Sequence, residues 1–278
     1  MSNLNSGKGH KDENFPVASW LVKPQYRAPV MAYYHFARVS DDIADHPTAP
    51  DAEKLRLLAE MRAGLNGQGA PEAVKLGEVA RASGLDLTHA HDLLDAFVLD
   101  VTKRRYQDWD DLIAYCRLSA VPVGRFVLDV HGEDRALWPM NDALCAALQV
   151  INHLQDCGKD YHALDRVYIP EPLVNIADLG ADAASPALIG VIRDLARQTQ
   201  NLLRQSAPFA RAIRDPRLSA EVAVIQALAE DLTKGLLTRD PLSQNVHHGK
   251  LRSAMIASRA ITRNLYSRSC RAKSRQTA

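Results

Sequence analysis

Apolar residues recur at intervals of three and four along nearly the whole chain, and no segment shows the strict alternation typical of a β-strand. Stretches rich in glycine and proline interrupt this pattern and mark helix ends. We therefore predict an all-α fold, with helices at 28–46, 51–63, 71–83, 86–103, 108–117, 119–131, 141–163, 186–209, 217–238 and 251–263. Pro122 is expected to kink or interrupt its helix, because proline lacks the amide hydrogen that a helix interior requires.

The chain contains no internal repeat and no linker that would separate two sets of helices. We predict one helical domain at 15–263, preceded by a flexible segment at 1–14 and followed by a basic tail at 264–278. A chain of 278 residues is long enough to bury a substantial core within such a domain.

A polar stripe runs along the predicted helix at 28–46. At about 100° per residue, its members fall on one face of the helix. They are Tyr34, Arg38, Asp41 and Asp45. The opposite face is apolar, and this combination is typical of a buried helix whose polar stripe faces a cavity.

A second stripe lies on the predicted helix at 141–163, where Asn152, Asp156 and Asp160 follow one another at intervals of four residues. Two such stripes facing each other across a bundle would suit Mg²⁺, which takes a few carboxylates and completes its shell with water and phosphate oxygens. The pattern favours the metal site, and the alternative interpretation at this point is carboxylates on a solvated surface.

Composition adds few constraints. The chain is 46% hydrophobic and 24% charged with a net charge of +1, as in an ordinary soluble globular protein, and this balance argues against nucleic acid as a partner. The four cysteines lie far apart without a CxxC pair, so neither disulfides nor structural zinc is expected and a reducing cytoplasm fits best. We expect neither a signal peptide nor a transmembrane segment.

The segments "YYHFARVSDDIAD" and "QVINHLQDCGKDYHALDRVYIP" resemble the squalene/phytoene synthase family. The resemblance extends from about Phe15 to about Pro241 and implies a class I isoprenoid synthase bundle with a central active-site cavity. By motif position it implies catalytic roles for Asp41, Asp45, Asp156 and Asp160, and Mg²⁺ ligation by the same four and Asn152. It places substrate contacts at Tyr34, Arg38, Gln149, Tyr115 and Phe15.

Within that family, "SGKGHKDENFPVAS", "YCRLSAVPVGR" and "HLQDCGKDY" resemble the bacterial hopanoid branch, which forms hydroxysqualene. The implied activity is that of a Mg-dependent carbon–oxygen lyase that ionises presqualene diphosphate and captures the carbocation with water. Two positions depart from the general family pattern: Gln155 replaces a common arginine, and Lys159 replaces a common acidic residue. Losing that arginine is compatible with a substrate whose two prenyl halves are already joined.

Three alternatives remain open. A relative that condenses two prenyl diphosphates to squalene, phytoene or dehydrosqualene would share the motifs. A non-catalytic helical member would be expected to lose metal ligands, and here all five positions are filled. A di-iron bundle would require Glu-x-x-His pairs, which the relevant helices lack.

The end of the chain is basic. After Asp240 there are eight lysines and arginines and no acidic residue. We predict attraction to anionic lipid, with a cytoplasmic protein contacting the inner membrane face; the alternative is a solvated end. The adjacent His247 and His248 do not share a helix face and are interpreted as a loop.

Overall fold

The computed structural model describes residues 23–276, with side chains described up to residue 270, and contains no strand within that range. The helices are α1 (Pro24–Ala44), α2 (Asp51–Gly64), α3 (Pro71–Ser83), α4 (Thr88–Thr102), α5 (Trp109–Ser119), α6 (Val121–Val130), α7 (Trp138–Gln155), α8 (Cys157–Leu164), α9 (Pro186–Ser206), α10 (Phe209–Ala212), α11 (Pro216–Leu236) and α12 (Lys250–Gln276). The predicted all-α fold is confirmed.

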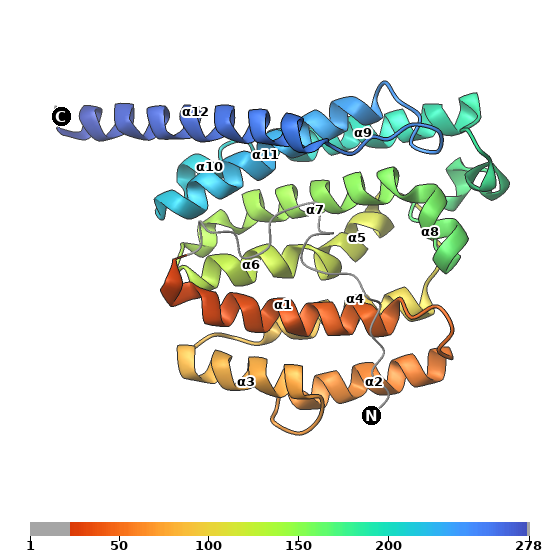
Figure 1. Cartoon of the computed structure of the whole chain (residues 1–278), viewed down its shortest axis with the longest axis horizontal. Helices are drawn as coiled ribbons and strands as arrows, with labels where there is room; N and C mark the ends of the chain where they lie inside the picture. Colours follow the sequence, from red (N-terminus) through yellow and green to blue (C-terminus); the bar gives the residue numbers. More distant parts are fainter. Residues whose placement is uncertain (1–22, 277–278) are drawn as a thin grey trace.

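The helices lie roughly parallel or antiparallel in successive layers (Figure 1). Helices α2 and α3 occupy one edge, α1 and α4 the next layer, α5 to α7 the middle, and α9 to α12 the opposite edge. One apolar core joins helices α1 to α4 and includes Phe36, Leu94 and, from α6, Phe126. A second core, which includes Ile151 and Ile192, joins the helices from α5 onward. The two candidate motifs therefore lie on helices of different layers.

Local capping chemistry sets several helix ends. The side chain of Asp108 accepts a hydrogen bond from the Asp111 amide at the start of α5, and Ser185 does the same for Leu188 at the start of α9. Helix α3 ends at Gly84, whose φ of 65° lies in the left-handed region that favours glycine. These signals explain why the predicted helix bounds agree closely with the structure here.

Pro122 lies in the first turn of α6, directly after the break at Ala120, where φ is −122°. The expected interruption does not occur within α6, which continues unbroken to Val130, because the first turn is where a missing amide hydrogen costs least. Further along, the predicted helix at 186–209 ends at Ser206, and a separate short helix, α10, follows.

The helix predicted at 141–163 is in fact two helices, because Asp156 leaves helical geometry at φ −101° and ψ 12°. The break does not disturb the four-residue spacing. The amide of Asp156 donates to the Asn152 carbonyl at 2.9 Å, and the amide of Asp160 donates to the Asp156 carbonyl at 2.8 Å. The three residues of the second stripe thus remain on successive turns.

The predicted helix end at residue 263 is wrong, since α12 continues to Gln276. Buried Asn264 donates to the Ser219 hydroxyl at 3.0 Å, and Arg268 donates to the Ile213 and Arg214 carbonyls at 2.9 and 2.8 Å. Docking on α10 and α11 therefore stabilises helix beyond the predicted end. None of the described helices is long and apolar enough to cross a membrane.

Candidate active site

The first stripe lies along the second half of α1, where it is only partly exposed. Arg38 donates to Asp42 at 2.5 Å and lies 3.5 Å from a carboxylate oxygen of Asp41. Asp42 is buried and was not among the predicted site residues. Its contact with Arg38 holds the guanidinium against the helix. Tyr34, one turn earlier, is half-buried.

Asp45 caps the C-terminus of α1, where its amide donates to the Asp41 carbonyl at 2.8 Å. Its Oδ1 accepts a hydrogen bond from Arg166 at 2.5 Å. Arg166 lies in the segment after α8, 121 residues away in the sequence, and its side chain is only 7% exposed. A buried guanidinium thus fixes one carboxylate of the first motif.

Arg166 is also held by α4. Its Nε donates to the Asp100 carbonyl at 2.9 Å, and its Nη1 lies 4.0 Å from the Asp100 carboxylate. That carboxylate accepts hydrogen bonds from Tyr115 at 2.8 Å and from Tyr168 at 3.1 Å. Burial raises the pKa of Asp100 to about 6, although Arg166 and the tyrosines oppose the shift. Burial alone would lower the pKa of Arg166, but the charges of Asp100 and Asp45 raise it, so the guanidinium stays charged.

The second stripe lies at the junction of α7 and α8. Half-buried Asn152 precedes Asp156 and Asp160, whose side chains are 29% and 20% exposed. Two histidines approach these carboxylates: His153 lies 3.9 Å from Asp160, and His247 lies 4.0 Å from Asp156. Burial lowers the pKa of His153, so the imidazole is neutral at neutral pH.

A continuous set of contacts connects the two motifs. The ring of His153 stacks on that of Tyr168, with centroids 3.5 Å apart. The hydroxyl of Tyr168 donates to Asp100, which lies against Arg166, and Arg166 donates to Asp45. The carboxylates of α8 and of α1 are therefore joined through side chains of α7, α4 and the segment after α8.

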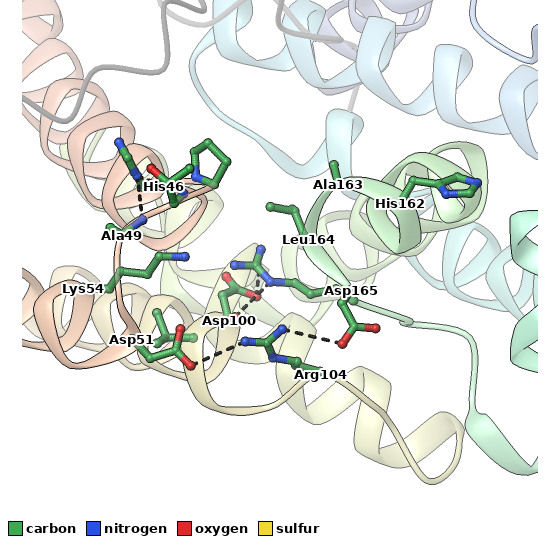
Figure 2. A pocket seen from close by; sticks show the side chains of 14 residues that line it. His46, Ala49, Asp51, Lys54, Asp100, Arg104, His162, Ala163, Leu164 and Asp165 are labelled. Carbon is green, nitrogen blue, oxygen red and sulfur yellow. Dashed lines mark hydrogen bonds and ion pairs between the residues drawn. The ribbon is translucent and has the colours of Figure 1, made fainter.

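A polar cavity of about 350 Å³ opens beside this network (Figure 2). It lies between the loop after α1 and the end of α8, with Asp100 and Arg166 among its lining residues. Burial lowers the pKa of Lys54, which donates to the Ala44 carbonyl at 3.1 Å. At the rim, Arg104 lies 3.4 Å from Asp51 and 3.6 Å from Asp165, as the dashed lines show.

The structure gives further roles to residues chosen from the sequence. Tyr115, predicted as an aromatic contact to substrate, is buried and donates to Asp100. Gln149 is half-buried on α7, and Phe15 lies outside the described residues, as do residues 1–14. His247 and His248 lie in a loop, as predicted. Sequence reasoning did not find Asp100 or Arg166, because no local pattern marks either residue.

The predicted metal ligands have the right chemistry for a hard cation, since carboxylate and amide oxygens are what Mg²⁺ prefers. Within the described residues, no three His, Cys, Asp or Glu side chains are grouped closely enough to hold a metal ion. Mg²⁺ is commonly bound through one or two carboxylates together with substrate phosphates, so a shared protein and diphosphate shell agrees with this arrangement. Arg166 binds Oδ1 of Asp45, so Oδ2 is the oxygen of this carboxylate that is left to coordinate a cation.

Comparison with known proteins gives a consistent result. Residues 8–252 match the model of the squalene/phytoene synthase family. A hydroxysqualene synthase from Zymomonas mobilis is 53% identical over 95% of this chain and 92% of its own length. One from Rhodopseudomonas palustris is 52% identical over 88% of this chain and 87% of its own. The crystal structure of a squalene synthase from Alicyclobacillus acidocaldarius aligns with a TM-score of 0.70 at 28% identity, covering 79% of this chain and 86% of that one.

Proposed function

The chain belongs to the squalene/phytoene synthase family, and from that premise we propose that it converts presqualene diphosphate and water to hydroxysqualene and diphosphate. The observation that carries the proposal is the similarity to two hydroxysqualene synthases, at 52–53% identity over most of both chains. The Lys159 and Gln155 positions, which depart from the general family pattern, agree with it.

The reaction begins when the carbon–oxygen bond to the diphosphate breaks and its electron pair leaves with the diphosphate. The carbocation rearranges, the oxygen of a water molecule bonds to it, and the water loses a proton to solvent. We propose that Mg²⁺ would be held together with the substrate diphosphate, with protein ligands from Asp41 and Asp45 at the first motif and from Asn152, Asp156 and Asp160 at the second. When bound, it would neutralise negative charge on the leaving diphosphate.

The chain's own residues would prepare this step. Arg38 supplies a fixed positive charge on the first stripe, since Asp42 holds its guanidinium. Arg166 orients Asp45 and neutralises part of the carboxylate charge that would otherwise accumulate there. Neutral His153 adds no positive charge beside the second motif, so it does not repel a carbocation or a metal ion.

The second candidate is the condensation of two prenyl diphosphates, favoured by the structural likeness to a squalene synthase. Gln155 bears on this choice. The Gln155 side chain is buried and uncharged, and its Nε2 donates a hydrogen bond to the Val246 carbonyl at 3.4 Å. An arginine at this place would bring a positive charge for a second diphosphate, and this chain has none there. We therefore favour a single, preassembled C30 substrate.

The test is product analysis by mass spectrometry. Purified protein with Mg²⁺ and presqualene diphosphate, without NADPH, should yield hydroxysqualene, whereas farnesyl diphosphate should not be consumed efficiently. Asp41→Asn should abolish turnover while the helical circular dichroism persists. Efficient conversion of farnesyl diphosphate would favour the second candidate, and near wild-type turnover by the Asp41 variant would refute the site assignment.

A further inference from the structure

Helix α12 lies at the outer edge of the molecule and packs on α10 and α11 with one face (Figure 1). That inner face carries buried Asn264 and the half-buried Ala257, Ala260 and Ile261. The C-terminal part of the helix extends past α10 in Figure 1. The opposite face of α12 is therefore open to the surroundings of the molecule.

This outer face exposes large apolar side chains near both of its ends, with the exposed Ser258 and Thr262 between them. Leu251, Met255, Leu265 and Tyr266 have exposed fractions of 76%, 47%, 52% and 73%. At 3.6 residues per turn they lie within an arc of about 100°, opposite Asn264. They account for four of the six strongly exposed large apolar side chains in the described chain, so the exposure is concentrated on one helix face. We call these four residues the α12 stripe.

Positive charges flank the α12 stripe. Arg252, Arg259 and Arg263 are exposed and lie along one side of it at helical spacing. Arg252 is paired with Asp231 at 2.8 Å, but Arg259 and Arg263 make no ion pair with any residue that the structure describes. Residues 241–278 contain eight lysines and arginines and no acidic residue. Every lysine, arginine, aspartate or glutamate within this segment is thus positively charged.

We propose that α12 lies in the surface of an anionic lipid bilayer, with the α12 stripe among the acyl chains and the arginines at the headgroups. An amphipathic helix with an apolar face and basic flanks has the features of such an interfacial element. Basic residues near an anionic leaflet strengthen binding, and salt weakens it. The stripe supplies apolar burial, and the arginines select for negative charge.

The pattern of charges favours lipid over the other occupants. A second copy of this chain docked face to face and antiparallel on α12 would place Arg259 and Arg263 of both copies on the same side of the interface, and like charges across an interface repel. A soluble polyanion would neutralise the arginines but would leave Leu251 and Tyr266 exposed to water. An anionic bilayer would bury the apolar side chains of the α12 stripe and also neutralise the arginines beside it.

Vesicle co-sedimentation tests the proposal with the full chain. We expect binding to vesicles of phosphatidylglycerol and phosphatidylcholine, and little binding to phosphatidylcholine alone. Met255→Gln with Leu265→Gln should weaken binding at least tenfold, because both apolar anchors leave the acyl region. Arg259→Gln with Arg263→Gln should also weaken it at least tenfold, at about fivefold per arginine, and should reduce its salt dependence. The matched control is Leu173→Gln, which removes an equally exposed leucine elsewhere.

Circular dichroism and turnover in detergent establish that each variant is folded. Unchanged vesicle binding by the Met255 and Leu265 variant would overturn the proposal. So would vesicle binding lost equally in the Leu173 control. If wild-type protein fails to bind vesicles and is a dimer that the stripe variant converts to a monomer, the face belongs to a second copy and the lipid assignment is wrong. Vesicle binding and turnover are separate measurements, so the failure of one does not decide the other.

Discussion

Arg166 offers the sharpest test of the contact network. Its side chain is 7% exposed and donates to Asp45 at 2.5 Å, to the Asp100 carbonyl at 2.9 Å and to the Ala44 carbonyl at 3.1 Å. Arg166→Met keeps much of the volume but removes all three hydrogen bonds and the charge. Breaking a buried pair in this way costs about 3–5 kcal/mol, because the carboxylates left behind are poorly solvated.

The size of the loss should depend on Asp100. Its pKa of about 6 allows it to become protonated in mild acid, which would relieve part of the unpaired charge. At pH 7.5 we expect the full loss of about 3–5 kcal/mol in the free energy of unfolding, and at pH 5.5 a smaller one. Urea denaturation followed by circular dichroism measures both values.

Two controls separate charge from geometry. Arg166→Lys keeps the charge, but an ammonium group cannot reproduce the planar fork that reaches three acceptors, so we expect an intermediate loss of about 1–3 kcal/mol. Arg197→Met removes an arginine whose side chain is 63% exposed and whose ion pair with Asp194 is on the surface; its effect should be about 0–1 kcal/mol. An Arg166→Met variant within 1 kcal/mol of wild type at pH 7.5 would refute the assigned role.

Three further predictions concern other parts of the molecule. Asp156→Asn should lower turnover of presqualene diphosphate by more than a hundredfold without changing the circular dichroism, measured by diphosphate release. As the pH falls from 7.5 to 5, wild type should gain stability relative to Asp100→Asn in urea unfolding, because the folded state takes up a proton that the unfolded carboxyl does not yet bind. Gly124→Ala should cost about 1–3 kcal/mol, since its Cβ would lie 2.6 Å from Cys145 Sγ, whereas Gly190→Ala meets nothing within 4 Å and should not destabilise.

Many helix bounds could be predicted closely because they depend on local sequence patterns. The bounds predicted for α3, 71–83, agree with the structure, since a proline begins that helix and a glycine ends it. The end of α12 could not be predicted in this way. Its extension to Gln276 depends on contacts of Asn264 and Arg268 with residues 45 to 55 positions earlier, which leave no periodic signal in the sequence.

Within the candidate site, local patterns likewise predict the spacing of the aspartates but not the position of Arg166. The spacing of Asp41 and Asp45, or of Asp156 and Asp160, is a property of one helix or of two joined by an intact hydrogen-bonded turn, so sequence alone places each pair. Arg166 stands in an irregular segment whose partners are 66 and 121 residues away. No helical period relates it to them.

The relation between the two motifs therefore depends on residues that neither motif contains. Arg166 binds Asp45 of the first motif, and His153 lies near Asp160 of the second. Tyr168 connects the two motifs, because its ring stacks on His153 and its hydroxyl donates to Asp100 beside Arg166. Arg166 and Tyr168 both belong to the short segment after α8, where the amide of Val167 donates to the Arg104 carbonyl at 2.9 Å. A change that shifts this segment should disturb both carboxylate groups together, even though it leaves every predicted metal ligand in place.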